Sequence, residues 1–477
     1  MIIPKNIYDK WKDLVLNELP IDRVLPRVKP LPISAKFHKN YKRIQWHKRA
    51  NNYDRFDLLE RKKEKIEREL PIEYKRGLTF NDAYITLCPN PFSVDLYRGG
   101  HVCYGCTYCF SIRCETALLS SFYDNWQKVL VAPIDVDKIR KQFREAERKD
   151  DMVSRAIRRR LVLHAGNNIE NYIEHIEKKT GVGYQFMELM KDLDYPYIIN
   201  TKSDIWDHPK FFKLLSETDK VMVQCTILTH DDKVAKKIEP FAPTVTRRFK
   251  ALQTLNESGI RAVVRSEPYM YTISPTLDSE IDSFIAKLKE ASVPYVNVGA
   301  YNTSVQSEEI SSLFAQTGFS FTNLLNSQMG FYQTLSLEKA LFKFRDAGIK
   351  VGSFNPATYA IQDTVDCCGF TLEGEKPKAG LDKFNTVEVS REVMRRGKMD
   401  WDDVIRWSRP IYSDQYIKRF YDFWHNKPFR NVWWGNWSFG GRVHGMIEDG
   451  DATYRYSPED ILRKRLHMKE VIEKVVK

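Results

Sequence analysis

Short apolar runs alternate with longer amphipathic segments from about residue 155 to 355, and this rhythm most constrains the fold. The runs cover 161–166, 195–203, 220–229, 260–268, 293–300 and 349–354. Between them lie segments whose apolar residues have helical spacing. Alternation of this kind predicts βα units around a parallel sheet. With one more strand before residue 103, the sequence predicts an α/β fold, a partial (β/α)6-type parallel barrel that stays open.

The two ends of the chain differ from this central part. Residues 1–80 are highly charged and punctuated by proline, which predicts an extension wrapped on the core. Residues 81–355 form the predicted barrel. Residues 356–477 are rich in tryptophan, tyrosine and arginine, and we expect substrate choice to depend on this C-terminal region.

Composition and charge indicate the setting. No apolar run reaches the roughly 20 residues that span a bilayer, so we expect a cytoplasmic protein with no membrane segment. The formal net charge is +12, from 75 basic and 63 acidic residues. Together with basic, aromatic stretches such as 37–55 and the arginine run 155–161, this surplus favours a nucleic-acid partner. The alternative is a charged surface that only confers solubility.

The eight cysteines are clustered, which favours metal binding over a disulfide scaffold. Cys103, Cys106 and Cys109 lie on one short loop, in the sequence HVCYGCTYCF. A structural zinc site needs four ligands, which His101 or Cys114 could complete. A [4Fe–4S] cluster can instead use three thiolates and keep one iron open for chemistry.

Three closely spaced cysteines ahead of a βα barrel resemble the radical S-adenosylmethionine enzymes. The segment 223–268 is similar to the spore photoproduct lyase-like branch of that family. Its matching elements are Thr226, the turn Thr229–Asp231–Asp232, Glu239–Pro240 with Ala242–Pro243, Arg248, Gly259–Ile260 and Pro268, and the branch's "TKS" matches Thr201–Lys202–Ser203. The resemblance covers about 95–300.

The resemblance implies a [4Fe–4S] cluster on Cys103, Cys106 and Cys109. It also implies that S-adenosylmethionine binds the open iron and is cleaved reductively to a 5′-deoxyadenosyl radical. An electron donor such as flavodoxin or ferredoxin is then a partner. The family loop usually has three residues between its first two cysteines, whereas this loop has two. Gly99 and Gly100 can absorb the difference, and Cys88 and Cys114 are the alternative ligands.

The resemblance and the strand ends together suggest which residues contact the cofactor. The candidates are Tyr108, Gly166, Asn167, Asn168, Lys202, Ser203, Thr226, Arg265 and Glu267. Lys202 is expected to pair with the methionine carboxylate. The glycine and asparagines suit the amino group and ribose, or form a plain β–α turn. Arg265 and Glu267 contact ribose or carboxylate, or form a structural ion pair.

The adjacent Cys367 and Cys368 are candidate catalytic residues. They could ligate a metal, donate a hydrogen atom to a radical, or have no chemical role. The favoured function is radical modification or repair, of the lyase type, of a nucleobase or nucleotide in DNA or RNA. One alternative is a radical enzyme that acts on a peptide or small metabolite. The other is a non-catalytic, zinc-stabilised nucleic-acid-binding protein.

Overall fold

The computed structural model describes part of the 477-residue chain. The longer described stretches are 4–19, 77–80, 90–98, 132–167, 169–270, 273–300 and 328–353, and shorter pieces lie at 104–108 and 361–469. Among these residues, no helix combines the length and the apolar composition that a membrane span requires.

An eight-stranded sheet forms the centre of the molecule, in the order β1-β2-β5-β6-β7-β8-β9-β10. Its strands are β1 (Thr79–Phe80), β2 (Phe92–Val94), β5 (Leu163–Ala165), β6 (Tyr197–Thr201), β7 (Val221–Thr226), β8 (Ala262–Tyr269), β9 (Tyr295–Ala300) and β10 (Lys350–Gly352). All neighbouring pairs are parallel except β1 and β2. The described sheet runs from β1 to β10 without closing. It confirms the predicted open, partial α/β barrel.

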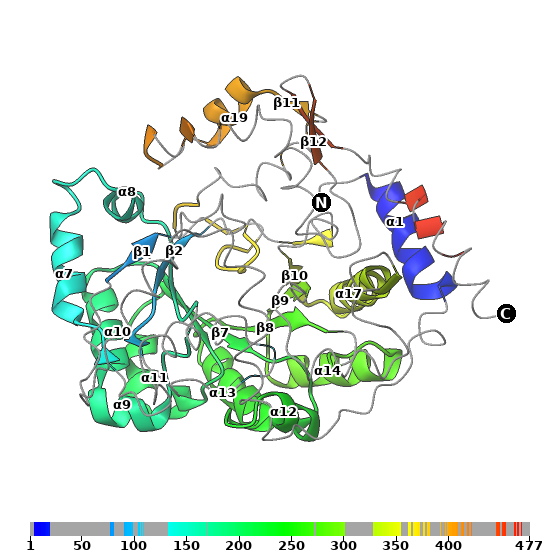
Figure 1. Ribbon diagram of the computed structural model, residues 1–477. Coiled ribbons are helices and arrows are strands. Elements are labelled where there is room, and N and C mark those ends of the chain that lie inside the picture. Colours follow the sequence, from blue (N-terminus) through cyan, green and yellow to red (C-terminus); the bar gives the residue numbers. More distant parts are fainter. Residues whose placement is uncertain are drawn as a thin grey trace, which may run out of the picture.

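Helices follow the strands at the predicted positions and cover one side of the sheet (Figure 1). They are α7 (Val136–Glu145), α8 (Met152–Arg158), α9 (Glu174–Thr180), α10 (Val182–Asp192), α11 (Pro209–Ser216), α12 (Asp232–Ile238), α13 (Val245–Glu257), α14 (Asp278–Glu290) and α17 (Gln328–Asp346). Local sequence sets several starts: Asp231 and Thr244 cap α12 and α13, and Pro209 opens α11.

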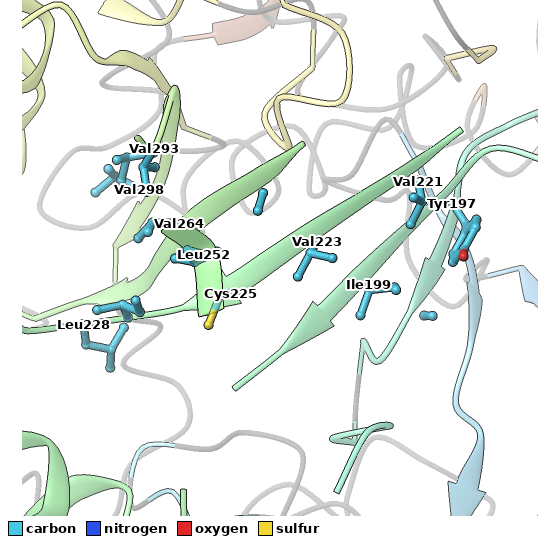
Figure 2. Packing of buried hydrophobic residues seen from close by; sticks show 14 of the residues in the cluster. Tyr197, Ile199, Val221, Val223, Cys225, Leu228, Leu252, Val264, Val293 and Val298 are labelled. Carbon is cyan, nitrogen blue, oxygen red and sulfur yellow. The ribbon is translucent and has the colours of Figure 1, made fainter. Parts of the chain in front are cut away.

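The helix-facing side of the sheet is a hydrophobic core (Figure 2). Alternate residues of the strands point into it, including Tyr197, Ile199, Val221, Val223 and Val264. Cys225 belongs to this set and is 1% exposed, so it packs as a small buried hydrophobe. Burying each such valine or isoleucine contributes about 1.5–3 kcal/mol before the entropy of ordering is subtracted.

The opposite side, which we call the inner face, carries the other strand residues. Val162, Ile198, Met222, Val263 and Tyr295 form a second buried cluster there. A short segment from the C-terminal region covers this cluster with Cys367, Cys368, Phe370 and Leu372. The domain boundaries at residues 80 and 355 stay a prediction.

The two ends of the chain meet at α17 (Figure 1). Helix α1 (Lys5–Asp13) continues into the π-helical turn η1 (Leu14–Glu18). The indole of Trp11 donates to the fully buried carboxylate of Glu338 at 3.0 Å, and Arg465 donates to the same carboxylate at 2.5 Å. Burying Glu338 is tolerated because Arg465 supplies the opposite charge.

The remaining elements lie outside the large sheet. Strands β3 (Tyr97–Arg98) and β4 (Ala132–Pro133) form an antiparallel pair. In the C-terminal region, β11 (Lys398–Met399), β13 (Asp451–Tyr454) and β12 (Gly445–Glu448) form a small sheet, and α19 (Trp401–Ser408) follows β11.

Candidate functional site

The cysteine loop is described at three positions: Tyr104, Cys106 and Tyr108. Cys106 is 8% exposed. Cys103 and Cys109 lie outside the described residues, as do the alternatives His101, Cys88 and Cys114 and the candidate Asn168. Among the described residues there is no group of three or more metal-ligating side chains. The proposed ligand set stays a prediction.

Tyr108 attaches the loop to the turn that follows α12. Its hydroxyl donates to Glu239, whose other carboxylate oxygen accepts from Arg248 at 2.5 Å. Arg248 is 1% exposed and also donates to the carbonyls of Pro243 (3.0 Å) and Thr226 (2.8 Å). Burial raises the pKa of Tyr108 well above its usual value, so it donates as a neutral phenol. Glu239 and Arg248 therefore have a structural role.

Tyr104 attaches the other side of the loop. Its carbonyl accepts from the backbone N–H of Phe241 at 3.2 Å. Its side chain is hydrogen-bonded to Ser203, the last residue of the TKS segment. The backbone of Cys106 is thus flanked by two anchored tyrosines. Both anchors lie at the carboxyl ends of strands or in the turns beyond them, where α/β sheets bind ligands.

Lys202 lies beside the cysteine loop, immediately after β6. Its ammonium nitrogen is 5.7 Å from the centre of the Tyr108 ring. The backbone N–H of Lys202 donates to Glu170 at 2.7 Å, and the hydroxyl of Thr201 donates to the same carboxylate at 2.6 Å. Burial raises the pKa of Glu170, and these hydrogen bonds oppose that rise. Glu170 therefore fixes the strand end that presents Lys202.

Gly166 directly follows β5 and has a φ of +91°, a conformation that favours glycine. A Cβ atom there would lie 2.5 Å from the carbonyl oxygen of Asn200. The close approach brings Asn167 next to β6, where the Asn200 amide donates to the Asn167 side-chain oxygen at 3.1 Å. Any other residue at position 166 would push these two strand ends apart.

Polar strand residues also lie on the inner face of the sheet. Asn200, Gln224 and Asn297 are each no more than 5% exposed. The amide oxygen of each side chain has no hydrogen-bond partner among the described residues. Leaving a buried acceptor unpaired costs about 1–3 kcal/mol. Three such oxygens on one face therefore suit a bound ligand that carries N–H or O–H groups.

Thr226, Arg265 and Glu267 belong to the same face. Thr226 pairs in register with Arg265 across β7 and β8. Arg265 forms an ion pair with Glu267 within its own strand, at 2.6 Å. The structure thus contains the structural ion pair, which the sequence offered as the alternative to a cofactor contact by these two residues. A cofactor contact by Arg265 and Glu267 stays a prediction.

The Cys367–Cys368 turn is held firmly against the inner face. Tyr295 donates to the carbonyl of Cys367 at 2.5 Å, and Gln224 donates to that of Cys368 at 3.0 Å. The fully buried Asp366 accepts two backbone N–H bonds from the residues that follow the pair. Gly369 has a φ of +76°, and a Cβ there would lie 2.4 Å from the Tyr295 ring.

Cys368 contacts His164, a residue that the sequence analysis did not select. Its sulfur lies 3.6 Å from Nε2 of His164, and Nδ1 lies 3.3 Å from the Asn167 oxygen. Burial and the charge of Arg265 lower the pKa of His164 to about 4, so the ring is neutral. With its proton on Nδ1, the ring donates to Asn167 and leaves Nε2 to accept from the thiol.

Strand periodicity could have identified the missed residues. His164, Asn200 and Gln224 each lie two positions before a selected residue: Gly166, Lys202 and Thr226 respectively. Residues two apart in a strand share a face. A polar residue two positions before a selected strand end is therefore a candidate for the same site.

The basic run at 155–161 is used within the fold. Arg155 forms two hydrogen bonds with Asp150 and donates to the carbonyl of Tyr412 at 2.7 Å. Arg158 donates to two backbone carbonyls near α7, and Arg160 pairs with Asp194 at 3.5 Å. These arginines hold α8 in place, so the run gives less support to nucleic-acid binding than its sequence suggested.

No family model and no curated protein matches the chain. Solved structures do match. SuiB of Streptococcus suis, bound to the precursor peptide SuiA, is 12% identical with a TM-score of 0.31, over 47% of this chain and 44% of that one. Spore photoproduct lyase complexed with dinucleoside spore photoproduct is 16% identical with a TM-score of 0.33, over 48% of this chain and 60% of that one.

A mutant of the same lyase, with bound AdoMet and dinucleoside spore photoproduct, is 16% identical with a TM-score of 0.35, over 51% of this chain and 64% of that one. This chain thus spans less than two thirds of each of these solved chains. Their TM-scores are below 0.5, so a proposed function has to rest on this chain's own residues. The lyase whose branch the segment 223–268 resembles is among the structures similar to this chain.

Proposed function

We propose that the chain is a radical S-adenosylmethionine enzyme. The observation that carries this proposal is the attachment of the cysteine loop. Tyr104 and Tyr108 hold it at the carboxyl ends of the strands, and Lys202 lies 5.7 Å from the Tyr108 ring. A loop that only carried a structural zinc ion would not need a cationic side chain beside it.

The residues present fit the two groups that such an enzyme requires. Cys103, Cys106 and Cys109 would hold a [4Fe–4S] cluster with one open iron. When bound, the cluster supplies one electron that cleaves S-adenosylmethionine into methionine and a 5′-deoxyadenosyl radical. Lys202 would pair with the methionine carboxylate. The unpaired oxygens of Asn200, Gln224 and Asn297 would accept hydrogen bonds from amino and hydroxyl groups.

Cys368 is the candidate catalytic residue on the inner face. The turn that carries it is fixed by Tyr295, Gln224 and Asp366, and its sulfur faces His164. This placement favours hydrogen-atom donation over the other roles. A metal site would need more ligands than one neutral histidine, and the described residues around the pair offer no such set. Cys367 contributes its carbonyl to the same turn.

For the substrate, we propose a nucleobase or nucleotide within DNA or RNA. Support comes from the net charge of +12 and from the arginine- and tryptophan-rich segment 401–442. In that segment Arg406 on α19 pairs with Asp403 at 2.7 Å and has a 73% exposed side chain. A peptide or small metabolite is the alternative substrate, and the electron donor would be a flavodoxin or ferredoxin.

Metal analysis after anaerobic reconstitution tests the proposed function. We expect about four irons per chain, and nearly none in a variant with Cys103, Cys106 and Cys109 all changed to alanine. The reduced protein should also form 5′-deoxyadenosine from S-adenosylmethionine. A Cys225→Ala variant, which alters a cysteine on the helix-facing side, should keep full iron content. Zinc in place of iron would favour the zinc-stabilised nucleic-acid-binding protein.

A further inference from the structure

An exposed phenylalanine lies on the outside of the turn that holds the cysteine loop. Phe241 is 71% exposed, the largest value among the exposed large hydrophobic side chains of the described chain. Its neighbours Ile238 and Glu239 are both 2% exposed. The turn is therefore anchored from inside and presents one aromatic ring to solvent. A single exposed ring is common on protein surfaces and needs further observations to indicate a partner.

The surface next to this ring is basic. Lys233, Lys236 and Lys237 lie on one side of α12, opposite its buried Ala235 and Ile238. The Lys236 ammonium donates to the carbonyl of Pro240 at 2.5 Å, which joins the helix face to the residue before Phe241. We call Phe241 with these three lysines the Phe241 face.

The acidic groups near the Phe241 face are engaged at the start of the helix. Asp231 caps α12 by accepting from the N–H groups of Lys233 and Val234. Asp232 accepts from the backbone and hydroxyl of Thr246, at 3.2 and 2.7 Å. These carboxylates lie at one end of the helix. At the Phe241 end of the face, the turn adds no exposed acidic group beside the lysines, because its Glu239 is buried against Arg248.

The Phe241 face lies directly behind the cysteine loop. The N–H of Phe241 donates to the carbonyl of Tyr104, the residue between Cys103 and Gly105. Two residues earlier in the turn, Glu239 accepts from Tyr108. The side chains that hold the loop and the ring that faces solvent thus belong to one short turn.

We propose that the Phe241 face docks an acidic protein that carries one electron at a time. This inference rests on the proposed function, since only a cluster on the cysteine loop would need the electron. The reduced carrier loses one electron and the cluster gains one, so the transfer balances without another reactant. Redox partners use small, transient interfaces, and one exposed aromatic among lysines suits that size. Lysines would steer an acidic carrier and make the rate depend on salt.

Stopped-flow reduction of the reconstituted full-length protein tests the proposal, with flavodoxin hydroquinone as the probe. In the double variant Lys233→Glu/Lys237→Glu we expect the second-order rate at low salt to fall at least about tenfold. The rate of this double variant should also lose the steep salt dependence that we expect of the wild-type rate. Phe241→Ser should slow the reaction several-fold. Reduction by dithionite should be unchanged in every variant.

The matched control is Lys138→Glu/Lys141→Glu, which reverses two exposed lysines on α7, far from α12 in Figure 1. This control should keep the wild-type rate with flavodoxin. Equal rates in the wild type and both Phe241-face variants would overturn the docking proposal and leave the proposed function intact. A wild-type protein that holds no cluster reducible by dithionite would overturn the proposed function as well.

Discussion

The hydroxyl of Tyr108 donates a hydrogen bond to Glu239, a residue 131 positions further along the chain. Glu239 in turn pairs with Arg248, and both are almost fully buried. One residue of the cysteine loop is therefore attached to a charged pair that also holds the end of β7 through the carbonyl of Thr226. Through these bonds the position of the loop depends on the sheet.

Replacing Tyr108 by phenylalanine should destabilise the protein by about 1.5–3 kcal/mol, because a buried carboxylate loses a hydrogen-bond donor. Urea denaturation measures the change. Tyr172→Phe is a matched control, since Tyr172 is fully buried and its hydroxyl has no partner among the described residues. That variant should be neutral or slightly more stable. Equal losses in the two variants would mean that the bond to Glu239 contributes nothing.

Lys202→Met should weaken S-adenosylmethionine binding by about 1.5–3 kcal/mol, because it removes a charge-assisted contact while keeping the aliphatic stem. Calorimetry on the reconstituted variant measures this, and its iron content should equal that of the wild type. Lys210→Met is the control. Lys210 also lies over a tyrosine, 3.5 Å from the centre of the Tyr184 ring, but on α11. If Lys202→Met binds S-adenosylmethionine as tightly as the wild type does, Lys202 is only a surface residue.

His164 should make the fold sensitive to mild acid. Its folded-state pKa is lowered by burial to about 4, whereas an unfolded histidine titrates near 6.5. Between these values the unfolded chain binds a proton that the folded chain does not, so stability falls as pH decreases through this window. The loss from pH 7 to pH 5 should be about 2 kcal/mol.

The matched comparison is His164→Gln against His175→Gln, a change at an exposed position on α9. Denaturation at pH 7 and pH 5 should show that His164→Gln removes about 2 kcal/mol of the pH dependence, which is more than the exposed control variant removes. An unchanged pH dependence in His164→Gln would contradict the burial of a neutral ring.

Much of the fold could be predicted from the sequence because most residues of the parallel strands are buried, on both faces of the sheet. The run 220–229 is apolar enough to be recognised without alternation, and β7 (Val221–Thr226) lies within it. Recognising the strands also located their carboxyl ends, and these ends identified Gly166, Lys202 and Thr226 as candidate site residues. What local sequence could not provide was long-range contact. Nothing in the spacing of Cys367 and Cys368 indicates that their turn packs on the inner face, because that position depends on Tyr295 and Gln224.

The same limit applies to charged residues. The run 155–161 suggests a phosphate-binding surface when only composition is considered. In the structure Arg155 and Arg158 reach acceptors on neighbouring segments, and local sequence does not reveal those partners. By contrast, Glu239 and Arg248 lie close together in one sequence motif, and in the structure they pair with each other around its tight turn.

Cys368 should exchange hydrogen with the radical produced in the proposed reaction. In D2O without substrate, its thiol carries deuterium, and abstraction would place that deuterium in 5′-deoxyadenosine. Mass spectrometry should detect the label in the wild type and in Cys225→Ala, whose cysteine lies on the helix-facing side. The label should be absent in Cys368→Ala. Persistent label in that variant would point to another exchangeable hydrogen on the inner face.

The protein should bind nucleic acid through its C-terminal region, with an affinity that falls steeply as salt rises. Phosphate contacts release counterions, so log K should decrease linearly with log salt concentration. Aromatic stacking should leave a salt-insensitive part of about 1–3 kcal/mol per base. Titrations of labelled single- and double-stranded oligonucleotides at several salt concentrations measure both parts. Replacing Arg406, whose side chain pairs with Asp403 and is 73% exposed, by alanine should reduce the salt slope by about 1, whereas Arg140→Ala on α7 should not change it. No binding to DNA or RNA at low salt would favour a peptide or small metabolite as the substrate.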